Sequence, residues 1–310
     1  MKGGETITVQ VPGLLAGVRV DRGVAMMADV SRAEASALIE AGRVLVDDVA
    51  VSLGRTELRE GSTLTVRLPD PGAGGVKPEA EVVFGVVHAD DEVAVVDKPA
   101  GLVVHPGAGH QEGTLVGGLL ACFPDLAQLV TAGVCEANRP GIVHRLDKGT
   151  SGLLAVARTP GAYASLVGQL ASRSMERRYL ALVMGELPDE RGEVDAPIGR
   201  SSRTPTKMAI AAGGKPARTS YTVLERRSGP PSTTLVELSL QSGRTHQIRV
   251  HMAAIGHPVV GDARYGTPDK RLGSGRFYLH AYKLGLTHPT TGERMEFTSP
   301  LPEDLDAYSS

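Results

Sequence analysis

A single carboxylate between two cations is the feature of this sequence best suited to chemistry. Asp147 lies between Arg145 and Lys148 in segment 141–154, which reads GIVHRLDKGTSGLL. A carboxylate flanked by cations is favoured in its ionised form, so it suits a nucleophile better than a proton donor. The residue types also allow a second interpretation, in which Asp147 is a loop residue that accepts hydrogen bonds from backbone N–H groups.

The residues around Asp147 predict a loop that leads into a buried strand. Segment 141–154 contains three glycines and no helix start signal, and the apolar run 153–157 follows Asp147. We therefore expect Asp147 at the edge of a sheet.

A second group of polar residues lies in segment 242–252, which reads SGRTHQIRVHM. Thr245 is the expected cap of a helix that stops at Gly256. On that helix His246 and Arg249 are neighbours at i,i+3.

The rest of the pattern predicts many strands with few helices between them. A helix over 159–172 precedes an alternating strand at 177–183. Segment 93–96 is expected to turn back into a strand at 102–104. The other expected elements are a helix that opens at Gly113–Leu115 and strands at 219–224, 234–240 and 277–286. This predominance of strands favours an α+β architecture.

The charges of the chain are unevenly distributed. The net charge of −2 argues against a nucleic-acid partner, but residues 139–282 contain 21 Lys and Arg against 11 Asp and Glu, and the remainder contains 12 against 24. Between residues 196 and 224 there is no acid, and the cations are Arg200, Arg203, Lys207, Lys215 and Arg218. A solvated face would mix both signs, so this segregation favours a surface that faces a polyanion.

Length and composition allow one large domain and one small one. The chain has 310 residues, of which 41% are hydrophobic. Cys122 and Cys135 are too few and too far apart for a zinc site or a disulfide framework, and the nine histidines show no metal-ligand spacing. No apolar run approaches membrane-spanning length, and the N-terminus lacks the apolar stretch of a signal peptide. We expect a cytoplasmic protein without a bound metal.

The first part of the chain predicts a small unit of its own, over residues 15–68. Segment 20–27 is an amphipathic helix candidate, and a capping box at Ser31 opens a second helix that ends before Gly42. A hairpin over 44–51, with its turn at Asp47 and Asp48, and a strand at 63–68 follow. Segment 69–80 (PDPGAGGVKPEA) is a linker by composition, and the large domain is expected over 81–302.

Three motifs in order resemble those of the RluA/RluD-type pseudouridine synthases. They are HRLDKGTSGL at 144–153, VDKPAGLVVHP at 96–106 and GRTHQIRVHM at 243–252. The helix pair and hairpin of residues 15–68 resemble the S4 RNA-binding domain. The resemblance covers about residues 15–300, nearly the whole chain.

This resemblance implies a fold, a reaction and roles for three residues. The fold is α+β, the pseudouridine synthase fold, with a long mixed, mostly antiparallel sheet, a central RNA cleft and a small tethered S4-like domain. The reaction is isomerisation of uridine to pseudouridine in RNA without a cofactor. Asp147 is the implied nucleophile, Tyr179 stacks on the target uracil, and Arg249 pairs with Asp147.

The resemblance also implies an RNA partner, and the chain is expected to act as a monomer. The S4-like unit and the DKP and HPGAG patterns favour large-subunit ribosomal RNA, whereas relatives with the same core act on tRNA. The residues expected to bind RNA or to flip its base are Arg145, His144, Lys148, Arg244, His246, Arg200, Arg203, Lys207, Arg22, Arg32 and Arg43, with Arg55 as a further phosphate contact.

Two further classes of protein are open to the sequence. A non-catalytic RNA-binding assembly factor built on the same fold is disfavoured by the joint presence of Asp147, Tyr179 and Arg249. A metal-dependent hydrolase is disfavoured by the histidine spacing, and loss of activity in EDTA would be its signature.

Overall fold

The protein is described here by a computed structural model. The residues that it describes are 6–28, 30, 32–68, 75–107, 110–204, 206–272 and 275–306. The chain divides into two compact units, residues 1–75 and residues 76–310.

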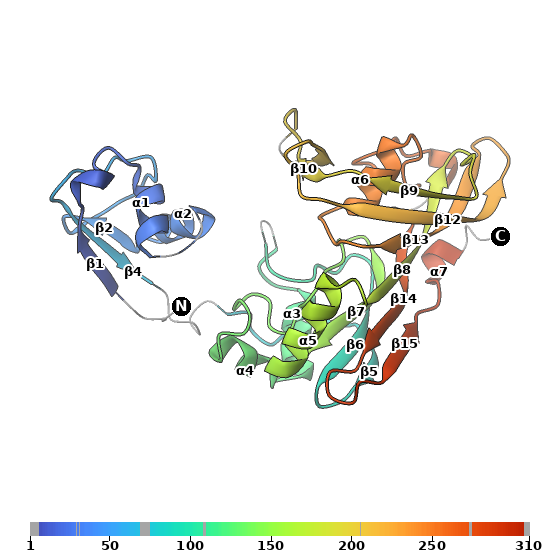
Figure 1. The fold of residues 1–310 in the computed structure, drawn as a ribbon, viewed down its shortest axis with the longest axis horizontal. Helices are drawn as coiled ribbons and strands as arrows, with labels where there is room; N and C mark the ends of the chain where they lie inside the picture. The colour runs from blue at the N-terminus through green and yellow to red at the C-terminus, as the bar shows by residue number, and fades with distance from the viewer. Residues whose placement is uncertain are drawn as a thin grey trace. The chain divides into compact units, whose positions relative to one another are not determined.

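The first unit consists, in its described part, of two α-helices and a four-stranded antiparallel sheet of order β1-β4-β2-β3 (Figure 1). Its elements are β1 (Thr6–Gln10), a 3-10 turn (Gly13–Leu15), α1 (Val20–Met27), α2 (Arg32–Glu40), β2 (Val44–Val46), β3 (Val49–Ala50) and β4 (Thr63–Arg67). Its core includes Val20 and Val24 of α1 and Leu64 and Val66 of β4.

The expected hairpin of this unit is present. Asp47 and Asp48 connect β2 to β3 with φ of 51° and 62°, the left-handed pair that a two-residue type I′ turn requires. Strand β1 was not expected from the sequence, and the proposed cap Ser31 lies outside the described residues.

The second unit is built on a nine-stranded sheet in the part of the chain that the structure describes (Figure 1). Its strands are β5 (Gly85–Ala89), β6 (Val93–Lys98), β7 (Ser151–Ala157), β8 (Glu176–Met184), β9 (Arg191–Asp195), β12 (Arg218–Arg227), β13 (Thr233–Leu240), β14 (Leu279–Thr287) and β15 (Arg294–Thr298). The order is β5-β6-β7-β14-β8-β13-β12-β9, with β15 on β14, and a separate hairpin joins β10 (Ile198–Arg200) to β11 (Met208–Ile210). Only the β7–β14 pair is parallel among the described strands, so the expected mixed, mostly antiparallel sheet is confirmed.

Helices cover both faces of the sheet around β7. The helices of this unit are α3 (Leu115–Cys122), α4 (Leu126–Thr131), α5 (Pro160–Ala171), α6 (Gln247–Ala254) and α7 (Glu303–Asp306), with a 3-10 turn at Lys270–Leu272. Leu153 and Ala155 of β7 share a cluster with Leu166 of α5, whereas Leu154 and Val156 share one with α3 and α4. Every residue of β7 is therefore buried, which explains its continuous apolar run.

The helix starts follow from capping residues that the sequence made recognisable. Thr159 caps α5 by accepting a hydrogen bond from the Ala162 N–H, with Pro160 in the first turn. Thr114 caps α3 in the same way, through the Gly117 N–H.

Glycine permits the parallel crossing of β7 and β14, which pair over only two residues each. Gly152 has a φ of 111°, and a Cβ there would lie 2.3 Å from the Ala281 carbonyl oxygen. No other residue type fits this approach of two backbones. The crossing fixes the position of the start of β7, which directly follows the Asp147 loop.

The expected return strand at 102–104 is wrong. Both edges of β6 are already paired, with β5 and with β7, so no edge is free for residues 102–104. Their hydrogen bonds go instead to the start of α3, from Leu115 N–H to Val103 O and from Val116 N–H to Val104 O.

The expected domain limits stay predictions, because residues 69–74 of the proposed linker lie outside the described residues. In the second unit, Glu79 accepts a hydrogen bond from the Gly113 N–H and donates its own N–H to Gly117 O. Within the described residues, no helix is long and apolar enough to cross a membrane.

Candidate active site

The Asp147 loop folds back over β7 and is held by it. The Ala157 N–H donates to Gly141 O at 2.9 Å, and the Ala155 N–H donates to His144 Nε2 at 3.0 Å. Gly141 has a φ of 72°, and a Cβ there would lie 2.4 Å from Ala157 O. The loop therefore has one backbone path, fixed by the strand beneath it.

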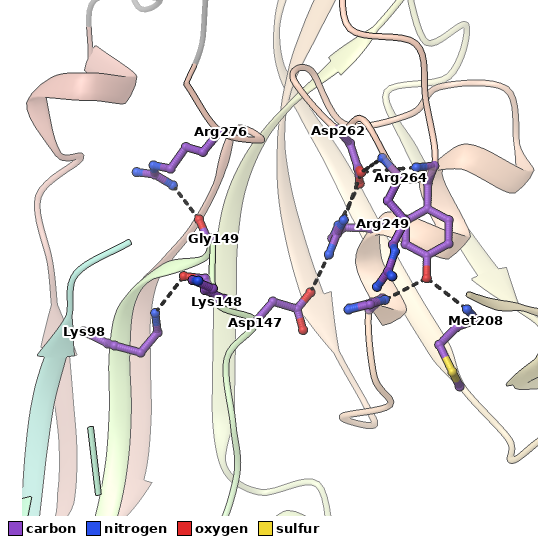
Figure 2. A network of polar contacts seen from close by, with 11 residues as sticks. Lys98, Asp147, Lys148, Gly149, Met208, Arg249, Asp262, Arg264 and Arg276 are labelled. Carbon is purple, nitrogen blue, oxygen red and sulfur yellow. Dashed lines mark hydrogen bonds and ion pairs between the residues drawn. The ribbon is translucent and has the colours of Figure 1, made fainter. Parts of the chain in front are cut away.

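The buried Lys98 and the partly buried Arg276 hold the carbonyl groups that follow Asp147 (Figure 2). Lys98 Nζ donates to Lys148 O at 3.3 Å and to Pro99 O and Leu102 O at 2.9 Å each. Arg276 Nη1 donates to Gly149 O at 3.0 Å. Burial lowers the pKa of Lys98 to about 7, against the opposing charge of Asp147.

Arg249 joins Asp147 to a second carboxylate, Asp262 (Figure 2). Arg249 Nη1 donates to Asp147 Oδ2 at 3.2 Å, whereas Nε and Nη2 donate to the two oxygens of Asp262 at 2.7 and 2.9 Å. The bidentate pair is the tighter one, so Asp262 orients the guanidinium, and one N–H of Nη1 reaches Asp147. Asp147 Oδ1 has no hydrogen-bond partner among the described residues and stays available to a substrate.

The Arg249–Asp262 pair is deeply buried. Asp262 is 1% exposed and also accepts hydrogen bonds from the N–H groups of Arg264 and Tyr265. Burial alone would raise the pKa of Asp262, but Arg249 and these N–H groups outweigh it and lower the pKa below its ordinary value. The guanidinium of Arg249 lies 4.1 Å from the ring centre of Phe277 and 5.1 Å from that of Tyr265.

These supports of Arg249 were missed in the sequence. Asp262 and Tyr265 lie in segment 261–266, GDARYG, whose acid and aromatic residue three positions apart are too common a pattern to predict a site alone. Lys98 and Arg276 were missed because only the folded chain brings their side chains to the backbone after Asp147.

A pocket of about 560 Å³ opens above Asp147. Tyr179 of β8 lines it, 5% exposed, and its hydroxyl makes no hydrogen bond within the described part of the chain. Burial raises the pKa of Tyr179, while the charge of Arg177 acts in the opposite direction, so the hydroxyl keeps its proton at neutral pH.

Cations dominate the wall of this pocket. Asp147 is the one carboxylate among its described lining residues. The arginines that line it are Arg139, Arg145, Arg173, Arg177, Arg244 and Arg249. Such an excess of positive charge around one acid suits a phosphodiester substrate.

The three residues expected to flank Asp147 have different surroundings. Arg145 lines the pocket, with Nη1 at 3.4 Å from His105 Nε2. His144 also lines it, but burial, together with the charge of Arg177, lowers its pKa to about 3. His144 is thus a neutral residue of the loop. Lys148 points away, with Nζ at 3.1 Å from His110 Nε2 outside the pocket.

The expected helix cap at Thr245 is wrong. Helix α6 begins at Gln247, and His246 takes the cap position in a left-handed conformation with φ of 57°. The Gln247 side chain holds this loop instead, because it accepts from Ser242 Oγ and the Arg244 N–H. His246 and Arg249 therefore share the pocket wall but not one helix face.

Of the remaining predicted RNA contacts in the second unit, Arg244 lines the pocket, whereas Arg200, Arg203 and Lys207 are not among its lining residues. Arg203 is exposed beyond β10, Arg200 is exposed on β10, and Lys207 donates to Arg264 O at 2.6 Å. In the first unit Arg22 is exposed on α1 and Arg43 is half-buried before β2, whereas the side chain of Arg32 lies outside the described set.

Other polar residues near the site have structural roles. His251, on α6, contacts Thr219 Oγ1 and Ala196 O at 2.9 and 3.0 Å and is fully buried. Among the described residues, no group of three or more His, Cys, Asp or Glu side chains is placed to hold a metal ion.

Comparison with known proteins identifies the family. Residues 92–254 match the family described as RNA pseudouridylate synthase. The chain is 44% identical over 277 residues to the uncharacterized RNA pseudouridine synthase YlyB of Bacillus subtilis. The aligned residues cover 89% of this chain and 88% of that protein. The chain is 43% identical to the ribosomal large subunit pseudouridine synthase D of Nitrosomonas europaea, with 97% and 86% covered.

A solved structure agrees with the sequence comparisons. Human RNA pseudouridylate synthase domain containing 1 superposes with a TM-score of 0.58 at 31% identity, over 74% of this chain and 89% of that one. The chain thus belongs to the RNA pseudouridylate synthase family, a family of isomerases. Within it the chain is of the RluA type, and relatives over nearly its whole length are named synthase D. The expected family, fold and activity are confirmed.

Proposed function

We propose that this enzyme isomerises specific uridines of large-subunit ribosomal RNA and that Asp147 is its nucleophile. The observation that carries the proposal is the placement of Asp147 as the one carboxylate in the described lining of a pocket with six arginines. The names of the synthase D relatives support the choice of RNA.

The reaction exchanges one glycosidic bond for another without a change in oxidation state. The N1–C1′ bond breaks, the uracil turns, and a C5–C1′ bond forms. The C5 proton is then lost, and N1 gains a proton. Asp147 has three routes open to it: attack at C1′ through an oxocarbenium-like state, proton abstraction to give a glycal, and attack at C6. Each route uses a free carboxylate oxygen such as Oδ1.

The neighbours of Asp147 receive roles from their contacts. Arg249 orients the carboxylate with one N–H, while two other N–H groups form the bidentate pair with Asp262, so Asp147 receives a single hydrogen bond. Tyr179 presents a buried aromatic side chain to the pocket, suited to stacking on the target uracil.

Substitution of Asp147 tests the assignment directly. We expect Asp147→Asn to reduce turnover by more than about 10³-fold, because the nucleophile is removed while the side-chain shape is kept. The melting temperature and RNA affinity should change little. Release of tritium from [5-³H]uridine RNA measures turnover, and pseudouridine formed above background by this variant would contradict the assignment.

Arg145 is proposed to help extrude the target base. A uridine inside a stacked helix cannot present C1′ and C5 to Asp147, so the nucleotide must be flipped, at a cost of roughly a few kcal/mol. Arg145 lines the same pocket two residues before Asp147, and its planar guanidinium can enter a vacated base stack.

Two RNAs separate base flipping from a simple phosphate contact. Arg145→Ala should slow turnover of a structured stem-loop by about 100-fold and recover much of that loss when the target uridine is already unpaired. A phosphate contact would give equal losses on both RNAs and a salt slope lower by about one ion. Equal losses would therefore refute the flipping role.

The first unit is proposed to be an S4-like RNA-binding domain. Its helix pair, its four-stranded sheet and the exposed side chains of Arg22 and Arg55 support this proposal.

Mapping pseudouridines in total RNA from a deletion strain tests the choice of RNA substrate. Loss of sites from tRNA but not from ribosomal RNA would favour the tRNA alternative.

A further inference from the structure

Arg177 is a buried cation to which the proposed reaction gives no role. It lies on β8 two residues before Tyr179, and alternate residues of a strand share a face. Both side chains line the pocket, and Arg177 is only 7% exposed.

No carboxylate among the described residues forms an ion pair with Arg177. Arg177 makes a long hydrogen bond, 3.4 Å from Nη2 to Leu240 O, and its buried Nε has no acceptor among the described residues. The adjacent Arg178, on the opposite face of β8, is paired with both Glu176 and Glu237. Of these two neighbouring arginines, the more exposed Arg178 thus has carboxylate partners, and the buried Arg177 has none among the described residues.

His144 is a further buried donor near Arg177, and the charge of Arg177 helps to lower its pKa. His144 accepts from the Ala155 N–H through Nε2, so Nδ1 carries the proton, and this N–H is buried without a partner. Gly243 leaves the space that the guanidinium occupies, because a Cβ there would lie 3.1 Å from Arg177 Nη1. Arg177 and His144 thus both line the pocket, and each has a buried N–H group without an acceptor among the described residues.

We propose that Arg177 binds the phosphodiester of the target nucleotide, with His144 as a neutral second donor. A buried guanidinium without an anion is strongly unfavourable, and a phosphodiester supplies both the charge and the acceptor oxygens that the site lacks. The inference rests on the proposed function, since it places the phosphate relative to a uracil at Tyr179.

The spacing on β8 fits one nucleotide. Residues two apart on a strand are separated by about 7 Å, so a base against Tyr179 leaves its own backbone phosphate within reach of the long Arg177 side chain. The phosphate contact exists before and during the reaction, so it contributes to binding rather than to the chemical step.

Stability and kinetics together distinguish this binding role from a structural one. Arg177→Gln should raise the melting temperature by about 2–4 °C, because an unpaired buried charge is removed. It should raise KM about 10–100-fold with kcat nearly unchanged. Arg178→Gln, one residue along and facing away from the pocket, is the matched control and should leave KM unchanged. A structural arginine would give the opposite result, a lower melting temperature with KM unchanged.

A neutral phosphate analogue identifies the group that Arg177 contacts. The phosphodiester on either side of the target uridine is replaced in turn by a methylphosphonate. At one position the wild type should lose about 10–100-fold in kcat/KM, whereas Arg177→Gln should lose almost nothing further. Gly243→Ala, which displaces the guanidinium without removing its charge, should reproduce part of the loss.

The possible failures are distinguishable. Equal losses for wild type and Arg177→Gln at both positions would overturn the phosphate assignment and indicate a contact with the base or none. The methylphosphonate losses of the wild type and Arg177→Gln are compared on whichever RNA the wild type converts, a 23S fragment or a tRNA stem-loop. Conversion of the tRNA alone would refute the ribosomal substrate and leave the Arg177 test intact. If Arg177→Gln does not fold, the assignment also fails, since a structural need is then shown.

Discussion

Arg249 touches two carboxylates, and the geometry gives them unequal shares. Asp262 receives two short hydrogen bonds and Asp147 a single bond of 3.2 Å. A guanidinium that was free to pair fully with Asp147 would cover both of its oxygens. Asp262 therefore acts on the reaction through Arg249, as a positioning residue.

Substitution of Asp262 should uncouple Arg249 from its fixed orientation. We expect Asp262→Asn to cost about 3–5 kcal/mol of stability, because a buried ion pair loses one charge, and to lower kcat about 100-fold through misplacement of Arg249. Urea unfolding and single-turnover kinetics measure the two effects. Asp269→Asn, which breaks the exposed pair with Arg271, is the control and should change neither quantity. Unaltered kcat in Asp262→Asn would show that Arg249 needs no such support.

Side chains from distant elements hold the loop before β7, in addition to its backbone hydrogen bonds. Lys98, at the end of β6, contributes three hydrogen bonds to carbonyl oxygens, and Arg276, before β14, contributes one to Gly149 O. Three acceptors match the three N–H groups of a protonated Lys98. Burial opposes that charge, which places the pKa of Lys98 at about 7.

This balance predicts a pH dependence of stability. In the folded protein Lys98 loses its proton near pH 7, whereas the unfolded chain keeps it until about pH 10.5. Between these values the unfolded state binds more protons, so raising the pH favours the folded state through this group. The penalty of the buried charge is complete below pH 7 and is relieved above it.

Comparison with Lys98→Met isolates the contribution of Lys98. From pH 7 to pH 9 the wild type should gain stability relative to Lys98→Met by up to about 1.4 kcal/mol per pH unit. Urea unfolding at several pH values measures the difference. Parallel stability curves for the two proteins would show that Lys98 does not titrate in this window.

The two compact units of the chain have separate cores. Val20, Val24 and Leu64 belong to the core of the first unit, and the cores of the second unit begin at Val93. The charges also differ, since the arginine-lined pocket is built entirely from residues of the second unit. Truncation between the units can therefore test whether the second unit alone carries the chemistry.

Deletion of residues 1–75 should leave a folded catalytic unit. We expect the fragment 76–310 to convert a short unpaired RNA at nearly the full rate and to bind ribosomal RNA about 100-fold more weakly, because one of two linked contacts is lost. Circular dichroism, filter binding and tritium release measure these three properties. An insoluble fragment would refute the boundary, and full affinity for ribosomal RNA would refute the role proposed for the first unit.

The sequence by itself determined the features that are local in the chain. The cap Thr159, the helix start at 113–115, the buried strand β7 and the alternating strand β8 follow from short-range pattern. The motif around Asp147 identified the family and its reaction, because ten consecutive residues carry that information without the fold.

Tertiary structure decided the features that depend on which partners are free. Residues 102–104 form no strand because β5 and β7 already occupy both edges of β6. Helix α6 begins at Gln247, whose side chain accepts hydrogen bonds from the loop before it. No sequence pattern predicted the buried charges of Asp262 and Arg177 either. Whether a charge is paired depends on burial and on contacts between residues far apart in the chain, and only the folded chain establishes both.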